Sequence, residues 1–389
     1  MIYQYYIPTR ILFGKGSLST LHEQQLPGKK ALIVTSSGGS ARRYGYLGKL
    51  EHELDLAGAG YVLFDKILPN PTKAGVMEGA ALAKAEGCDF VVGLGGGSSI
   101  DSAKAISIMA RNPGDYWDYV CGGTAKCQPI PHDPLPVVAV TTTAGTGTEA
   151  DPWTVTTNTD TNEKIGFGYD KTFPVLSVVD HELMMSIPAH LTAYQGFDAL
   201  FHATEGYINN TANPMSDTFA LRSIALLGQN LARAVKNGAD EEARGNVALA
   251  NTLSGFVEVL SGCTSEHSIE HALSAYHPKL PHGAGLIMIC LAYYSHFAKA
   301  HSCDARMVDM AKALGHADAR EPMDFVKAMA DLMKECGVDE LKMSDYGIEH
   351  TNFGKYADNA MSAMGGLFSV DPSPLTRNDV IGMLHESYR

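Results

Sequence analysis

The feature that most constrains the fold is a change of pattern halfway along the chain. In the first half, short apolar runs typical of buried strands alternate with helical segments, and these runs cover residues 31–36, 61–68, 89–97 and 134–149. After Ser186-Ile187-Pro188, segments rich in Ala, Leu and Met with helical spacing replace them. Strands separated by helices predict a parallel, doubly wound α/β sheet. We therefore expect an α/β domain over residues 1–185 and an all-helical domain over residues 186–389.

Charge and hydropathy exclude several classes of partner. The 389 residues carry a net charge of −13, which does not suit nucleic acid, because its phosphates are bound mainly by Lys and Arg. The same charge disfavours anionic membrane surfaces. No stretch approaches about 18 uninterrupted apolar residues, and the N-terminus, MIYQYYIPTR, does not read as a signal peptide. We expect a cytoplasmic protein that binds neither nucleic acid nor membrane.

The number and distribution of the cysteines also favour a cytoplasmic protein. The seven cysteines are few, odd in number and dispersed, which fits free thiols in a reducing cytoplasm better than a disulfide framework. Cys121 and Cys127 lie closest together, but the spacing between them is longer than in most structural zinc sites. We interpret both as ordinary loop cysteines.

A glycine-rich turn follows the third strand-like run. The segment Gly93–Ile106 reads GLGGGSSIDSAKAI, and its glycines let a backbone approach a ligand closely. Ser98 or Ser99 can cap the helix that follows, whose free N–H groups favour an anion. The segment matches neither the GxGxxG fingerprint nor a Walker loop. It predicts phosphate binding, the alternative being a turn that only caps a helix.

Two further polar segments follow strand-like runs, Thr141–Glu149 (TTTAGTGTE) and Val34–Ser40 (VTSSGGS). In nucleotide-binding folds, an acidic residue near a strand end often binds the ribose hydroxyls. Here serines and glycines fill that place, followed by Arg42 and Arg43, so we expect no carboxylate to repel a 2′-phosphate. The pattern favours NADP(H) over NAD(H).

The second half carries a cluster typical of a metal site. Asp198 and His202 are four residues apart on a helical segment, so they share a face, although such pairs also occur as simple surface contacts. His267 and His271 repeat this spacing in EHSIEHALSAYHPKLPHG, where two prolines then end the helix and leave His282 on the following turn. One carboxylate and three imidazoles would suit Fe²⁺ or Zn²⁺. The alternative is that these polar groups serve unrelated structural purposes.

Together, GGGSSID, TTTAGTGTE, GFDALFHATEGY and EHSIEHALSAYHPKLPHG resemble the iron-containing (group III) alcohol dehydrogenases, over essentially the whole chain. The resemblance implies a dehydroquinate synthase-like architecture, with a Rossmann-like nucleotide-binding domain, a helical domain and an active site in the cleft between them. It also implies a homodimer and hydride transfer between NAD(P)(H) and a small primary alcohol or aldehyde. The serine–glycine run resembles the NADP-preferring butanol dehydrogenase-like branch.

The resemblance also implies roles for individual residues. Asp198, His202, His267 and His282 fall on the metal ligands. His271 falls on a histidine near the nicotinamide that is not a ligand, and we expect it to relay a proton. The expected cofactor-binding residues are Ser37, Gly38, Gly39, Ser40, Asn70, Gly96, Gly97, Ser98, Asp101, Thr141, Thr142, Thr146, Lys164 and Leu183.

The chain departs from the family pattern in three places. The segment between His271 and His282 is about one residue longer, and the extra His277 is an alternative loop ligand. We favour His282, because a proline precedes it and a glycine follows it. His181 stands where the family usually has Pro, and Ala150-Asp151 after Glu149 differs from the usual continuation, which could alter the substrate pocket.

Two other functions are compatible with these motifs. A metal-dependent lyase of the dehydroquinate synthase type would need a Lys/Arg cluster for a polyanionic substrate, but Lys279 is the one cation in the two ligand-bearing segments. The apolar neighbours in those segments favour a small, weakly polar alcohol or aldehyde, and they are Phe197, Leu200, Phe201, Leu273 and Tyr276. The other alternative is a catalytically silent nucleotide- or metal-binding protein.

Overall fold

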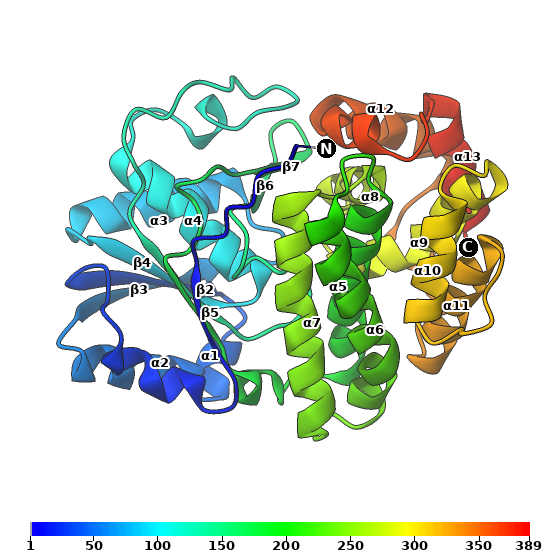
Figure 1. Ribbon diagram of the computed structural model, residues 1–389. Helices are drawn as coiled ribbons and strands as arrows, with labels where there is room; N and C mark the ends of the chain where they lie inside the picture. The colour runs from blue at the N-terminus through cyan, green and yellow to red at the C-terminus, as the bar shows by residue number, and fades with distance from the viewer. Residues whose placement is uncertain (1) are drawn as a thin grey trace. The chain divides into compact units, whose positions relative to one another are not determined.

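The computed structural model describes residues 2–389, which divide into two compact units. One unit is Tyr6–Ser186, and the other is Ile187–Arg389 together with the described residues before Tyr6. Figure 1 shows strands in the first unit and helices throughout the second. The division lies one residue from the boundary that we placed between residues 185 and 186.

The first unit is built on a six-stranded sheet with the order β1-β8-β5-β4-β2-β3. All of its strand pairs are parallel, as predicted. The strands are β1 (Arg10–Phe13), β2 (Lys30–Ser36), β3 (Gly60–Ile67), β4 (Phe90–Gly95), β5 (Val137–Thr141) and β8 (Leu176–Val179). The four apolar runs in the sequence correspond to β2 to β5, whereas β1 and β8 span only four residues each and were not predicted.

Helices cover both faces of this sheet (Figure 1). They are α1 (Ser40–Arg43), α2 (Tyr46–Leu56), α3 (Lys73–Ala85) and α4 (Gly97–Arg111), with the short helices η1 (Ser17–Glu23), η2 (Tyr116–Asp118) and η3 (His181–Met184). On one face, Ile33 and Val92 pack in a core with Leu50 of α2. On the other face, a Cβ at Gly93 would lie 2.9 Å from the Cα of Ile100 in α4, so glycine there lets the helix approach the sheet. The sheet is therefore doubly wound.

An antiparallel hairpin, β6 (Thr154–Asn158) and β7 (Glu163–Phe167), completes the first unit. It was not predicted, because its strands lack a long apolar run. Thr154 at its start is tied to α4, where its Oγ1 donates to the carbonyl oxygen of Asp101 at 2.7 Å. The hairpin therefore has a fixed position beside the helix that follows the glycine-rich turn.

The interpretation of Cys121 and Cys127 as loop cysteines with free thiols was wrong. The two form a disulfide, with their Cα atoms 4.4 Å apart. The spacing argument had tested them only as a zinc site, and a turn of this length brings the two side chains together. The other five cysteines are free, in agreement with the expectation for the rest of the chain.

The second unit is all-helical, as predicted. Its helices are α5 (Ala189–Ile208), α6 (Pro214–Lys236), α7 (Glu241–Leu260), α8 (Ser265–Tyr276), α9 (His282–Lys299), α10 (Asp304–Ala313), α11 (Met323–Glu335), α12 (Phe353–Ala363) and α13 (Arg377–Ser387), with η4 (Met343–Tyr346), η5 (His350–Asn352) and η6 (Gly365–Val370). The long helices α5, α6 and α7 pack against one another. Close packing requires glycine on α5, because a Cβ at Gly196 would overlap Leu231 of α6.

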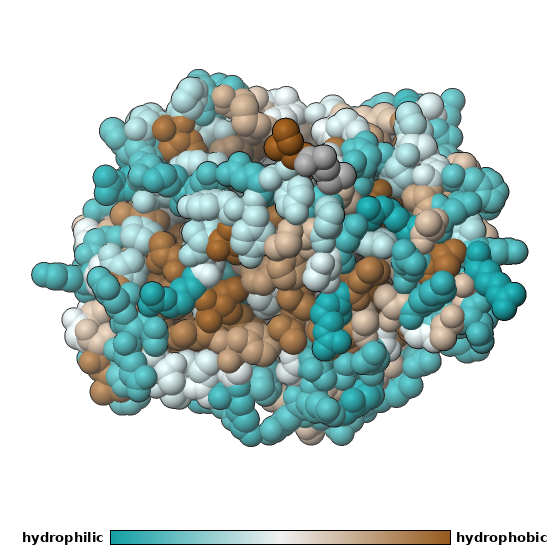
Figure 2. Space-filling model, viewed as in Figure 1, coloured by the Kyte–Doolittle hydropathy of each residue, from teal (hydrophilic) through white to brown (hydrophobic). Residues whose placement is uncertain are grey.

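Within residues 2–389 no single helix is long and apolar enough to cross a membrane, although α7 and α8, bent by 105°, pass that test as a pair on length and composition alone. Figure 2 shows apolar side chains interspersed with hydrophilic ones on the viewed face.

Candidate metal centre and cofactor loops

Three helices of the second unit bring the predicted metal ligands together. Asp198 and His202 lie one turn apart on α5, and His267 lies on α8. His282 is the first residue of α9 rather than a turn residue, because Pro281 acts as the N-cap and the helix begins directly after it. The four residues therefore sit on rigid elements.

The imidazoles converge on one carboxylate oxygen. Oδ1 of Asp198 lies 3.8 Å from Nδ1 of His202, 3.6 Å from Nε2 of His267 and 3.4 Å from Nε2 of His282. Asp198 Oδ1 and His267 Nε2 are buried, and neither has a hydrogen-bond partner among residues 2–389. Buried polar atoms without partners lower stability, and an ion bound between them would satisfy both. The donor set therefore fits a divalent metal ion such as Fe²⁺ or Zn²⁺.

Two buried glutamates orient the histidines. Glu205 binds Nδ1 of His267, and Glu270 binds Nδ1 of His282, which leaves Nε2 of each ring directed at Asp198. A carboxylate on the second ring nitrogen is typical of metal-binding histidines, because it fixes the ring and makes it more basic. Sequence reasoning missed both glutamates. Glu205 follows Asp198 by two helical turns, a spacing that would have identified it.

The charges at the centre reinforce one another. Burial alone would raise the pKa of Asp198, but the positive charges of His202 and His282 hold it well below its usual range. Burial lowers the pKa of His267, but its interactions with the neighbouring side chains of Cys263 and Glu205 outweigh that effect and raise the pKa well above its usual value. The centre thus combines an ionised carboxylate at Asp198 with a basic imidazole at His267.

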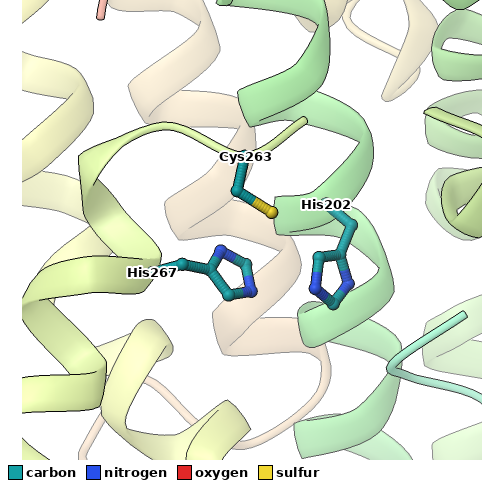
Figure 3. Close-up of side chains that lie close together, drawn as sticks. All are labelled: His202, Cys263 and His267. Atoms are coloured by element: carbon teal, nitrogen blue, oxygen red, sulfur yellow. The ribbon is translucent and has the colours of Figure 1, made fainter. Parts of the chain in front are cut away.

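Cys263 and Glu258 also lie at this centre and were not predicted. Glu258 Oε2 is 3.7 Å from Nε2 of His202. The Sγ of Cys263 and one nitrogen each of His202 and His267 lie within 4.8 Å of one another. Figure 3 shows the thiol of Cys263 directed at the two imidazoles, whose rings stack with their centroids 4.3 Å apart.

The remaining two histidines of the α8 region have different surroundings. His271 is buried beside the centre, with its ring centroid 5.3 Å from that of His282 and its Nδ1 3.0 Å from Sδ of Met364. Together with Glu270 and His282 it also forms a group of possible ligands. His277 is bound through Nε2 to the hydroxyl of Tyr356 at 2.8 Å and belongs to no such group within the described chain.

The predicted cofactor loops follow neighbouring strands. β4 lies between β2 and β5, and the strand order reverses beside β2, so the sheet has a switch point of the kind where α/β proteins bind ligands. A Cβ at Gly96 would lie 2.8 Å from Oγ1 of Thr143, and one at Gly97 would lie 2.5 Å from Cγ2 of Thr146. Glycine at these two positions therefore lets the loop after β4 pack closely against the loop after β5. It also allows a ligand to approach the backbone.

Other predicted cofactor residues differ in how accessible they are. Asn70 and Lys164, far apart in sequence, meet through a hydrogen bond of 3.1 Å. The carboxylate of Asp101 accepts from Oγ1 of Thr148 and from the backbone N–H of Val155. Leu183 is 1% exposed and packs in the core, so its side chain is not available to a ligand.

The serine–glycine run has a carboxylate neighbour that the sequence reasoning overlooked. Ser37, Gly38 and Ser40 are exposed after β2, as a cofactor site requires. Nη2 of Arg42, however, pairs with Oδ2 of Asp65 at 3.5 Å. The expectation that no acidic group lies at this place was wrong, because parallel pairing sets the end of β3 beside the end of β2.

Two interpretations of the substrate region also change. Asp151 forms a buried ion pair with Lys104, whose Nζ is 3.1 Å from its Oδ1, so the unusual Ala150-Asp151 step serves the interior of the first unit. The side chains of Phe197 and Leu200 are completely buried and belong to the helical core. They do not line a substrate pocket, and the argument for a weakly polar substrate loses that support.

A doubly wound parallel sheet with glycine-rich loops, joined in one chain to a buried carboxylate–imidazole centre, is typical of metal-dependent enzymes that bind a nicotinamide dinucleotide. Comparison with known proteins gives the family. Residues 8–181 match the model described as iron-containing alcohol dehydrogenase, and residues 192–388 match the C-terminal model of the Fe-containing alcohol dehydrogenase family. The chain belongs to the iron-containing alcohol dehydrogenase family.

Individual relatives agree with this assignment. The chain is 33% identical to a 1,3-propanediol dehydrogenase of Klebsiella pneumoniae, with 100% of this chain and 99% of the relative covered. It is 30% identical to a probable NADH-dependent butanol dehydrogenase of Bacillus subtilis, with 99% of each covered. The crystal structure of an archaeal halo-thermophilic alcohol dehydrogenase from a Red Sea brine pool superposes with a TM-score of 0.94 at 32% identity, covering 100% of this chain and 99% of that chain.

These findings establish a coarser identity than the sequence suggested. The chain is an NAD(P)-dependent alcohol dehydrogenase of this family, whose chemistry uses a metal ion and a nicotinamide cofactor. Propanediol and butanol dehydrogenases both occur among its relatives, so the butanol branch is not singled out. The butanol dehydrogenase relative is named for NADH, so the likeness to it gives no support to a preference for NADP.

Proposed function

We propose that the chain interconverts small primary alcohols and aldehydes by hydride transfer between the carbinol carbon and the nicotinamide of NAD(P). The observation that carries this proposal is the convergence of three imidazoles from three helices on the unpartnered Oδ1 of Asp198.

In this proposal Asp198, His202, His267 and His282 hold an iron or zinc ion. When bound, such an ion supplies Lewis acidity that lowers the pKa of an alcohol. Glu205 and Glu270 keep the ligand nitrogens of His267 and His282 in position through their Nδ1 atoms. Asp198, His202 and His267 are buried, which shields these donors from water and strengthens their electrostatic contacts, whereas His282 is partly exposed.

His271 is assigned to proton transfer rather than to metal binding. Its Nδ1 contacts the sulfur of Met364, so Nε2 is the atom that we assign to the proton. An imidazole titrates near neutral pH and can therefore both accept and return a proton during turnover. His277, held by Tyr356, has no part in the reaction.

The cofactor is assigned to the carboxyl edge of the parallel sheet. Gly96, Gly97 and Ser98 at the start of α4 offer backbone N–H groups to the pyrophosphate. Thr141, Thr142 and Thr146 complete that cradle, and the Asn70–Lys164 pair contacts the cofactor beside it. We assign a preference for NADP(H), supported by the exposed Ser37–Ser40 run and the two arginines after it, with Asp65 as the feature that opposes it.

A small, uncharged substrate is favoured over a polyanionic one. Lys279 remains the one cation within the two ligand-bearing segments, and a lyase acting on a polyanion would need several. We also propose a homodimer located in the cytoplasm. The homodimer rests on the family resemblance, and the location rests on the five free thiols, with the Cys121–Cys127 disulfide as the feature that opposes it.

The deciding experiment measures oxidation of NADH and of NADPH by metal-loaded protein with a panel of short-chain aldehydes. We expect turnover with primary aldehydes and a higher kcat/KM with NADPH. Absence of turnover with every aldehyde would overturn the proposed activity. Turnover with a higher kcat/KM for NADH would overturn only the cofactor preference.

A further inference from the structure

The thiol of Cys263 stands beside the proposed metal ligands and has no role in the activity described so far. It lies in the connection between α7 and α8, four residues before His267. Its Sγ and one nitrogen from each of His202 and His267 are all within 4.8 Å of one another (Figure 3). Sulfur and two imidazoles are donors that zinc sites commonly combine.

The backbone holds this cysteine in place. Gly262, with φ of 77°, turns the chain after α7, and the carbonyl oxygen of Cys263 accepts from Nδ2 of Asn209 at 3.2 Å. The backbone N–H and the hydroxyl of Thr264 donate to Oε2 of Glu205 at 2.8 and 3.0 Å. Because Glu205 also binds Nδ1 of His267, one carboxylate fixes both the histidine and the segment that carries the thiol.

The distances are compatible with coordination after a small adjustment. Zinc bonds of about 2.3 Å to sulfur and about 2.0 Å to nitrogen place neighbouring donors roughly 3 to 3.5 Å apart in four- and five-coordinate geometries. Donors within 4.8 Å of one another reach that separation by side-chain shifts of roughly an ångström. The Nε2 atom of His267, on a side chain only 5% exposed, has no hydrogen-bond partner among the described residues and is available as a donor.

We propose that Cys263 supplies a thiolate to the ion held by His202 and His267. The inference rests on the metal site of the proposed function and adds a sulfur donor to its oxygen and nitrogen ligands. Thiolate ligands favour zinc and its substitute cobalt, whereas a carboxylate is a hard donor. Cys263 thus shifts the metal preference of this chain toward zinc, within a family named for iron.

Cobalt substitution tests the proposal without relying on activity. Full-length metal-free protein is titrated anaerobically with Co²⁺, and its near-ultraviolet and visible spectra are recorded for wild type, Cys263→Ser and Cys263→Ala. Cys303→Ser is the matched control, because Cys303 is a free, partly exposed thiol at the N-cap of α10. We expect a thiolate-to-cobalt charge-transfer band in wild type and in the control, and its loss in both Cys263 variants, with visible cobalt bands retained. Zinc affinity should fall about tenfold or more in these variants, with a smaller loss for Fe²⁺.

The possible outcomes distinguish a failure of the Cys263 proposal from a failure of the proposed metal site. Visible cobalt bands without a charge-transfer band in wild type would overturn the role of Cys263 and leave the metal site standing. A charge-transfer band that persists in both Cys263 variants would also overturn it. Failure of the wild type to bind cobalt would overturn both the metal site and the thiolate. Circular dichroism of each variant confirms that a lost band does not reflect unfolding.

Discussion

Replacing Glu205 with Gln should weaken metal binding while leaving the protein folded. Glu205 is completely buried and binds His267 Nδ1 as well as the N–H and hydroxyl of Thr264. Glutamine keeps the shape and one accepting oxygen but removes the charge that makes His267 a basic ligand. Loss of such a partner lowers metal affinity about 10- to 100-fold, which corresponds to about 1.4 to 2.7 kcal/mol.

The same change should cost stability in the metal-free protein. A hydrogen bond to a charged group contributes about 1.5 to 3 kcal/mol, and glutamine replaces the carboxylate only in part. We expect a loss of about 2 kcal/mol in the free energy of unfolding. Calorimetric titration of metal-free protein with Zn²⁺ gives the affinity, and urea unfolding gives the stability.

Glu266 provides the matched control. It precedes His267 on α8 and is completely buried, but burial, helped by the negative charge of Glu205, raises its pKa well above the usual range. Burial thus favours the neutral form of Glu266, and Glu266→Gln replaces its carboxyl by a neutral group of the same shape. Equal zinc affinities for the two variants would refute the assignment of Glu205 as the group that orients His267.

Three further predictions concern other parts of the chain. The His271→Ala variant should retain its metal, as measured by elemental analysis, while its rate of hydride transfer falls about 10²- to 10⁴-fold. Metal loss as complete as in His267→Ala would refute the role of His271 as a proton relay. Replacing the Cys121–Cys127 pair by serines should lower stability by about 2 kcal/mol in urea, from the entropy of the short loop it closes, and an unchanged midpoint would count against a formed disulfide. Burial raises the pKa of Asp101 to about 6. Between about pH 4 and pH 6 the folded protein therefore keeps a proton on Asp101 that the unfolded chain releases. The stabilisation by this protonated carboxyl is lost as the pH rises through that range, and the loss amounts to about 3 kcal/mol. Asp101→Asn should abolish that part of the slope in urea midpoints, and an unchanged slope would contradict the raised pKa.

The sequence predicted those elements whose pattern is local and strong. β2 and β4 are continuous apolar runs because both of their faces are buried, and this pattern is readable without any partner. β6 (TVTTN) is rich in threonine and β7 (EKIGF) mixes charged and apolar residues, so neither is an apolar run, and the position of the hairpin depends on contacts with α4 that only the fold supplies. Strands that depend on tertiary contacts in this way carry little signal of their own.

In the candidate site, too, residues with a local sequence signal were predicted and residues that depend on long-range contacts were not. The Asp198–His202 spacing indicates a shared helix face, and His282 was chosen over His277 because the proline before it and the glycine after it match the family pattern, so both choices used local signals. Cys263 was passed over because cysteines were compared only with one another and not with nearby histidines. Its partner His202 lies on another helix, and no spacing along the chain expresses that proximity.

The cofactor preference depends on a contact of the same long-range kind. Arg42 lies in the helix after β2, Asp65 lies in β3, and the two form an exposed ion pair, with side chains 61% and 47% exposed. Such a pair contributes about 0 to 1 kcal/mol, whereas a hydrogen bond to a charged phosphate contributes about 1.5 to 3 kcal/mol. A 2′-phosphate can therefore displace Asp65 from Arg42 at a net gain, unless Asp65 itself faces the phosphate and repels it. The ratio of kcat/KM for NADPH and NADH measures the sign of this balance, and a ratio below one means that repulsion by Asp65 outweighs the attraction of Arg42.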